Sequence, residues 1–236
     1  MIALTRAELM KLHTVRSTWA VLLVLPVVAF VSLLDTALDP VEHNTSVVDF
    51  MDVSLVVVGL VVAACAAAVV GSEFVRRTVG LDYLAVPRRF PVLGAKVSAF
   101  ACVGAVLGLL SALLASAVVT PIAMGRGVVL DGPGNAVLRV LAVTAAITVL
   151  GALGAAIGVL VPHPAIAVGA VVGWQFIEML LAMAFGIGDY LPIGLITTVA
   201  HLGGTVALPV AFGLLFLYAA SAVGVALLLG SHRDLT

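Results

Sequence analysis

The sequence predicts an all-α, polytopic membrane protein. The chain of 236 residues is 63% hydrophobic and only 10% charged, whereas a soluble domain has about 25% charged residues. Six apolar runs are long enough, or nearly so, to cross a hydrocarbon core of about 30 Å, which takes about 20 helical residues. Most of the 11 basic residues lie between these runs or at the chain ends, and their distribution predicts the orientation of the helices.

The expected spans form one transmembrane domain over residues 1–236. They lie near residues 17–34, 53–71, 97–120, 137–161, 165–187 and 206–229. Pro26 predicts a kink in the first span, and a cleaved signal peptide is the competing interpretation of that run. Its length and the lack of a cleavage site with small residues argue against cleavage. We therefore expect six helices.

The basic residues predict that both termini are cytoplasmic. With six spans, nine of the 11 Lys and Arg residues fall on one side of the membrane. The loop 35–52 carries five acidic residues and no basic one, and the segment 188–205 has no basic residue either. Because basic residues are retained in the cytoplasm, we expect a multi-pass protein of the cell membrane with the segment 188–205 outside. That segment is too short to span, so it is expected to be an extracellular re-entrant or surface helix.

The first 16 residues are expected to form a helix on the membrane surface. Thr5 and Glu8 match a capping box, in which each side chain bonds the backbone amide of the other residue. Leu9, Leu12 and Trp19 recur on roughly one face, which is typical of a helix lying in the headgroup plane. The alternative is that these residues extend the first span into the cytosol.

The segment 72–96 carries five of the basic residues and is expected to be a structured cytoplasmic loop. Glu73 and Arg77 have the spacing of a helical ion pair. The expected helix has an apolar side with Phe74, Val75, Val79 and Leu84, and a polar side with Arg76, Arg77 and Asp82. Pro87 would end it, with Arg88 and Arg89 at its C-terminal end, where positive charge complements the helix dipole. The alternative is that the arginines only anchor the positive side.

The order of residues in this loop resembles that in permease subunits of type-2 ABC exporters. The matching residues are Gly71, Glu73, Phe74, Arg76, Arg77, Thr78, Leu84, Pro87, Arg88, Arg89 and Lys96. The N-terminal sequence Leu-x-Arg-x-Glu-Leu-x-Lys-Leu, the six spans and the cytoplasmic termini agree as well. The resemblance therefore covers essentially the whole chain.

This resemblance implies the membrane subunit of an ATP-driven exporter that moves a hydrophobic or amphipathic substrate, such as an antibiotic, a lipid or a peptide. It implies that the helix from Glu73 to Tyr83 docks on a separate ATPase, with Arg76 and Arg77 as contacts. The ATPase-coupling residues expected on this basis are Glu73, Phe74, Arg76, Arg77, Thr78, Asp82, Tyr83, Arg88 and Arg89. Such exporters usually have twelve spans, so we expect two ATPase copies with either a homodimer or a pair of related permeases.

The chain itself is not expected to be an enzyme. It has no phosphate loop of the form G-x-x-x-x-G-K-[ST], so ATP and Mg would be bound by the partner chain, and no cofactor or metal is expected here. No basic surface supports binding of nucleic acid. The alternative class is a non-ABC six-helix membrane protein, either a small secondary transporter or a scaffold.

Glu178 is the acidic residue in the middle of a span, and Trp174 and Gln175 lie about one turn away. A carboxylate inside the membrane is costly and often functional, so we expect these three residues to line the translocation pathway or the dimer seam. The alternative is a structural hydrogen bond to Thr144 or Thr148.

Pairs of glycines four residues apart predict close helix packing, because small residues let two backbones approach. These pairs are Gly104 with Gly108, Gly154 with Gly158, and Gly169 with Gly173.

Overall fold

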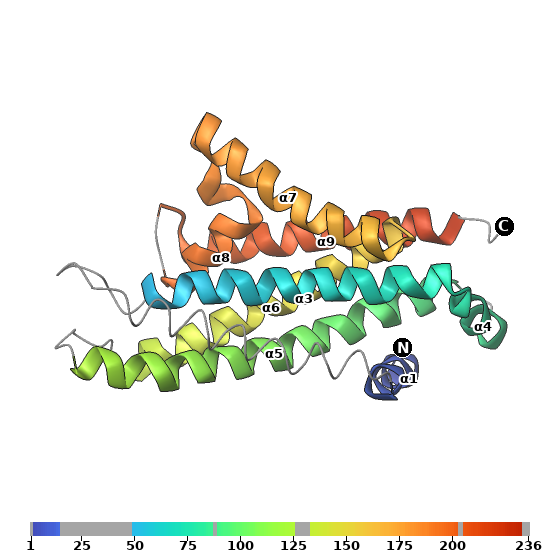
Figure 1. Cartoon of the computed structure of the whole chain (residues 1–236), viewed down its shortest axis with the longest axis horizontal. Helices are drawn as coiled ribbons and strands as arrows, with labels where there is room; N and C mark the ends of the chain where they lie inside the picture. Colours follow the sequence, from blue (N-terminus) through green and yellow to red (C-terminus); the bar gives the residue numbers. More distant parts are fainter. Residues whose placement is uncertain (1, 15–48, 87–88, 126–132, 203–204, 233–236) are drawn as a thin grey trace.

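The computed structural model describes residues 2–14, 49–86, 89–125, 133–202 and 205–232, and the regular structure in these ranges is helical (Figure 1). The helices are α1 (Ile2–Thr14), α3 (Asp49–Val75), α4 (Thr78–Ala85), α5 (Arg89–Gly125), α6 (Pro133–Leu160), α7 (Pro164–Phe185), η1 (Gly188–Tyr190), α8 (Pro192–Ala200) and α9 (Leu208–His232).

Five of the described helices, α3, α5, α6, α7 and α9, are long and apolar enough to cross a membrane. They coincide with the spans expected near 53–71, 97–120, 137–161, 165–187 and 206–229, so the all-helical class and these five long apolar helices are confirmed. The expected first span near 17–34, with Pro26, lies outside the described residues. The chain is therefore a helical membrane protein with at least five long apolar helices.

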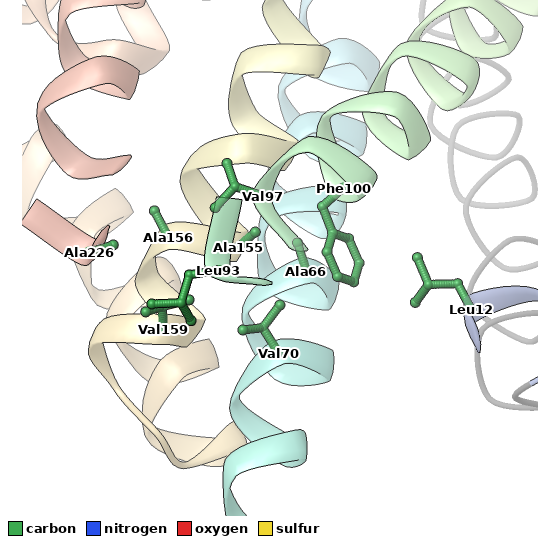
Figure 2. Packing of buried hydrophobic residues seen from close by; sticks show 10 residues of the cluster. All are labelled: Leu12, Ala66, Val70, Leu93, Val97, Phe100, Ala155, Ala156, Val159 and Ala226. Atoms are coloured by element: carbon green, nitrogen blue, oxygen red, sulfur yellow. The ribbon is translucent and has the colours of Figure 1, made fainter. Parts of the chain in front are cut away.

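Helix α6 lies at the centre of the bundle and contacts α3, α5 and α9. Small side chains fill the contact: Ala66 of α3 and Ala155 and Ala156 of α6 are fully buried. Figure 2 shows them together with larger residues of α5, and Leu12 of α1 points from the edge of this cluster toward Phe100. The core thus joins the N-terminal helix to the bundle.

The glycine pairs on α5 and α6 lie at close helix contacts, as predicted. A Cβ on Gly104 would lie 2.7 Å from the carbonyl oxygen of Ile147, and one on Gly158 would lie 2.7 Å from that of Ala67. The pair on α7 has no such contact within the described residues, because a Cβ on Gly169 would meet no atom within 4 Å, so for this pair close packing stays a prediction. Ala167 and Val171 of the same part of α7 pack against α3, so the glycines lie on another face, which has no described neighbour.

Several helix ends meet at one end of the bundle, where α1 and α4 lie. Figure 1 shows α1 nearly along its own axis while α3 and α5 run across the picture, so α1 lies across this end of the bundle. A Cβ on Gly71 of α3 would lie 3.3 Å from the backbone of Pro164, where α7 begins. A Cβ on Gly230 of α9 would lie 2.9 Å from Leu93 near the start of α5. The first and the last described helices therefore reach the same end.

The segment between α7 and α9 folds back onto the bundle. Helix α7 ends at Gly186, whose φ of 65° reverses the chain, and η1 leads into α8. Leu195 and Val199 of α8 are fully buried against α6 and α9. With nine residues, α8 is too short to span a bilayer, and its expected location on the extracellular side stays a prediction.

Candidate functional site

The segment after α3 contains a helix, but the helix is interrupted where the sequence predicts continuity. Helix α3 ends at Val75, and Arg77 has a φ of 58° before α4 begins at Thr78. This left-handed conformation is uncommon for a residue other than glycine, and it breaks the spacing that an i, i+4 pair needs. The predicted Glu73–Arg77 ion pair is therefore wrong: Glu73 pairs with Lys96 instead.

The same break corrects the predicted apolar side of this helix. Val79 is buried as expected, and Phe74 packs against the main core cluster. However, Val75 is 54% exposed and Leu84 is 83% exposed. The change of direction at Arg77 shifts the helical phase, so residues before and after it do not share one face.

The end of α4 agrees with the prediction, but Arg89 does not. The helix stops at Ala85, and Val86 is extended, as expected for a residue that precedes proline. Pro87 and Arg88 lie outside the described residues. Arg89 is the first residue of α5 rather than part of the end of α4, and its guanidinium lies 5.5 Å from the centroid of the Tyr83 ring. A cation over an aromatic ring at this distance is attractive, so Arg89 helps to hold α4 against α5.

Five charged residues meet beside α4, and we call them the charge cluster: Glu8, Lys11, Glu73, Asp82 and Lys96. The Lys96 ammonium bonds Glu73, lies 3.0 Å from Asp82 Oδ2 and lies 3.2 Å from Glu8 Oε1. The Lys11 ammonium lies 2.9 Å from Glu8 Oε1 and 2.5 Å from Asp82 Oδ1. These residues come from α1, α3, α4 and α5, so the charge cluster joins all four helices.

Lys96 is the centre of the charge cluster because its side chain is only 1% exposed. A buried ammonium is costly unless it is paired and hydrogen-bonded. Here three carboxylates surround it, and their side chains are 11% to 20% exposed. Lys96 is therefore the most buried of the contacts that hold α4, beside the Lys11–Asp82 pair and the Arg89–Tyr83 contact.

The contacts of Thr5 and Glu8 in α1 differ from the capping box predicted for the N-terminal segment. Helix α1 begins at Ile2, so Thr5 lies inside it and cannot cap it. The Thr5 hydroxyl instead forms a hydrogen bond of 2.9 Å with Ser98 of α5, while Glu8 binds Lys11 and Lys96. The capping box is therefore wrong, and α1 is fixed to α5 by polar contacts as well as by Leu12. Its expected place on the membrane surface stays a prediction.

The charge cluster changes the pKa of its members outside the long apolar helices. Burial raises the pKa of Asp82. The hydrogen bond from Lys11 and the charges of Lys96 and Lys11 lower it by a larger amount, so the net pKa is below its usual value. Burial lowers the pKa of Lys11, but hydrogen bonds to Asp82 and Glu8 outweigh burial and raise it. Both shifts favour the charged pair.

We expect the contribution of Asp82 to stability to disappear in acid. Because its folded-state pKa is lowered, the contribution is complete above the unfolded value of about 3.9 and is lost as pH falls through the folded-state value. The melting temperature of the unchanged protein should exceed that of Asp82→Asn at pH 7, and the difference should shrink between about pH 4 and pH 2. Thermal unfolding in one detergent at each pH measures this difference. A difference that stays constant would show that the Asp82 charge does not hold α4.

Two arginines at the break remain outside the charge cluster. The side chains of Arg76 and Arg77 are exposed, and none of the ion pairs within the described ranges includes either of them. Together with the exposed Val75 and Leu84, they form a surface that has both charge and apolar area.

Glu178 is buried at the start of α8. Its side chain belongs to α7 and is 3% exposed, and its Oε1 accepts a hydrogen bond of 2.5 Å from the backbone N–H of Ile193. The carboxyl group therefore lies at the N-terminus of α8, where the helix dipole favours a negative charge. The two threonines that were alternative partners of Glu178 donate their hydroxyls elsewhere. Thr144 donates to the carbonyl of Val140, and Thr148 donates to that of Thr144.

Trp174, Gln175 and Glu178 line one cavity of about 360 Å³. Its remaining walls come from α3, α6, α8 and α9 and are mostly aliphatic. They include Val56, Leu60, Ala63, Leu150, Leu153, Ile157, Pro192, Ile193, Ile196, Tyr218 and Val225. The structure thus brings the three predicted residues together in a pocket between helices, as ligand sites in bundles often are. No group of three or more His, Cys, Asp or Glu residues in the described ranges could hold a metal ion.

The sequence interpretation missed the charge cluster. The sequence predicts a capping-box role for Glu8, and Lys11 and Lys96 enter only through the order of residues in the family resemblance. Lys96 alone carried a usable signal. It is the eighth residue of the long apolar helix Arg89–Gly125, and a lysine in such a place needs an acidic partner.

The five long apolar helices and the buried charges define a helical membrane protein. No protein-family model matches the chain, and neither a curated protein nor a solved structure matches it.

Proposed function

We propose that this chain is the membrane-spanning subunit of an ATP-driven exporter of the type-2 ABC class, working as a dimer with two copies of a separate ATPase. The observation that carries the proposal is α4 with its charge cluster. A short helix between two long apolar helices, held rigidly to three other elements, is suited to transmit movement from a partner into the membrane.

The expected coupling residues divide into two groups by their contacts. Glu73 and Asp82 bind Lys96, so we assign them to positioning α4, together with the Tyr83–Arg89 contact. Thr78 bonds the Glu73 carbonyl across the break at 3.2 Å. The docking contacts are then left to the exposed Arg76 and Arg77.

The charge cluster offers a direct route for force. Movement of α4 is transferred through Lys96 to α5 and through the same ammonium to Glu73 of α3 and Glu8 of α1. A joint made of several buried ion pairs resists bending more than a single surface pair, because its side chains are already fixed. α4 and the start of α5 should therefore move as one body.

The basic residues support a cytoplasmic location for this end of the bundle. The basic residues at this end are Arg6 and Lys11 of α1, Arg76 and Arg77 in the turn between α3 and α4, and Arg89 at the start of α5. By the positive-inside rule, both termini and α4 lie in the cytoplasm of the cell membrane, where ATP is available to a partner ATPase.

The outer helices support a second copy of the chain. Helices α7 and α9 are less buried within the described structure than α3, α5 and α6. Their exposed side chains are mostly apolar and can contact lipid or another permease subunit.

We expect the double substitution Arg76→Ala with Arg77→Ala to uncouple the partner ATPase. In a purified complex with the ATPase, substrate-stimulated hydrolysis should fall about tenfold, equivalent to about 1.4 kcal/mol of lost interaction. Membrane insertion and the melting temperature of the chain should not change, because neither side chain takes part in the charge cluster. Arg6→Ala, which removes an exposed positive charge from α1, is the control and should keep coupling.

Two outcomes would contradict the proposal. If the double variant fails to insert or inverts its topology, the arginines act as topological anchors. If the purified chain transports with a proton gradient and without any ATPase, the protein belongs to the alternative class of small secondary transporters.

A further inference from the structure

Two buried oxygen atoms, on residues that line the cavity, lack a hydrogen-bond donor. Glu178 Oε2 and Gln175 Oε1 have no hydrogen-bond partner among the residues that the structure describes, although Glu178 is 97% buried. The two residues are three positions apart on α7 and both line the cavity. A buried acceptor that lacks a donor is costly, and more so when it is charged, so the arrangement favours a ligand that supplies donors.

The charge of Glu178 also lacks a counter-ion. None of the ion pairs in the described ranges includes it. Its partners are neutral donors: the backbone N–H of Ile193, which bonds Oε1, and the Gly194 backbone and Trp174 side chain beside it. The ligand should therefore carry a positive charge as well as hydrogen-bond donors. A metal ion fits poorly, because hard cations take six or more oxygen ligands and the walls here are aliphatic.

The size and lining of the cavity specify the rest of the ligand. Its volume of about 360 Å³ falls within the range of about 300–1,000 Å³ typical of small-molecule sites. Leu60, Leu150, Ile157 and Ile196 give it aliphatic walls, and Trp174 adds an aromatic one.

We propose that this cavity binds a lipophilic primary amine. Its ammonium turns the Glu178 and Gln175 side chains toward itself, as is common for side chains at a binding site, and donates hydrogen bonds to Glu178 Oε2 and Gln175 Oε1. Its apolar part lies against the aliphatic walls. Charge-assisted hydrogen bonds of this kind are stronger than neutral ones, and the low dielectric of the cavity strengthens them. That the amine is the cargo of the exporter rests on the proposed function. The binding itself does not.

The test uses the full chain in lipid nanodiscs without an ATPase, so it can fail or succeed independently of the coupling experiment. The chain has two tryptophans, and Trp19→Phe leaves Trp174 at the cavity wall as the single fluorophore. The probes are 4-bromobenzylamine and 4-bromobenzyl alcohol, which share an apolar ring with a contact quencher close to the polar head and differ only in that head. Comparing protein variants with one probe at a time cancels differences in partition into lipid.

We expect the amine to quench Trp174, and Glu178→Gln to weaken its apparent affinity about tenfold. The alcohol should show little change between the two variants. Asp189→Asn is the matched control, because Asp189 bonds Thr205 and does not line the cavity. It should leave the quenching by the amine unchanged.

Equal amine quenching in the Trp19→Phe protein with and without Glu178→Gln would overturn the proposal. So would quenching by the alcohol that matches that of the amine and depends equally on Glu178. If Glu178→Gln lowers the melting temperature, Gln175→Leu provides the second test. This substitution removes the other acceptor and leaves the Glu178–Ile193 hydrogen bond to α8 intact. It should also weaken the apparent affinity for the amine.

Discussion

Replacing Lys96 with Met is expected to destabilise the end of the bundle by about 3–5 kcal/mol, the cost of removing one partner from a buried ion pair. Lys96 is 1% exposed and bonds three carboxylates. Met has a similar length and fits an apolar site, so the change isolates the loss of charge. Glu73 would keep no partner in the charge cluster, while Lys11 would still bind Glu8 and Asp82.

Lys11→Met is the matched control for this prediction. Lys11 bonds two of the same carboxylates, but its side chain is 43% exposed. Ion pairs in contact with water contribute about 0–1 kcal/mol, so this variant should lose much less. Thermal unfolding in one detergent, with limited proteolysis of α1, measures both variants. If Lys11→Met destabilises as much as Lys96→Met, the charge cluster does not depend on its buried member.

The long apolar helices could be predicted from sequence because their signal is local. Each run contains enough consecutive apolar residues to satisfy the hydrocarbon core by itself, and the expected spans from 53–71 onward match described helices. Glu178 was also recognisable, because a carboxylate within such a run stands out without knowledge of its neighbours.

The charge cluster could not be predicted in this way because its members are distant in the chain. Glu8 and Lys96 are separated by 88 positions, and either residue alone is compatible with many partners. The local rule for ion pairs selected Arg77 for Glu73 instead. The rule failed because the helix is broken at Arg77, and a left-handed residue other than glycine has no reliable sequence signal.

The glycine pairs also show that local spacing does not predict tertiary contacts. All three pairs have identical spacing, yet only those on α5 and α6 approach another described helix. Spacing identifies a face that can pack closely, whereas the presence of a neighbour depends on the tertiary arrangement. The three-dimensional contacts therefore separate glycines that the sequence treats as equal.

We expect Gly154→Ala to be strongly destabilising and Gly173→Ala to be neutral or stabilising. A Cβ on Gly154 would lie 2.1 Å from the Ala63 carbonyl oxygen and 2.6 Å from its Cα. These atoms belong to the backbone of α3, so they cannot move aside as a flexible side chain would, and α3 and α6 must separate. Overpacking of this kind costs about 1–3 kcal/mol and occasionally more.

The control isolates helix packing from helix propensity. A Cβ on Gly173 would meet no atom within 4 Å, and alanine in a helix interior is favoured over glycine by about 0.5–1 kcal/mol. Both variants add the same methyl group to a long apolar helix, so lipid and detergent effects are similar. Thermal unfolding of the two proteins in the same detergent decides the point: equal stabilisation by both changes would mean that α3 and α6 do not touch at Gly154.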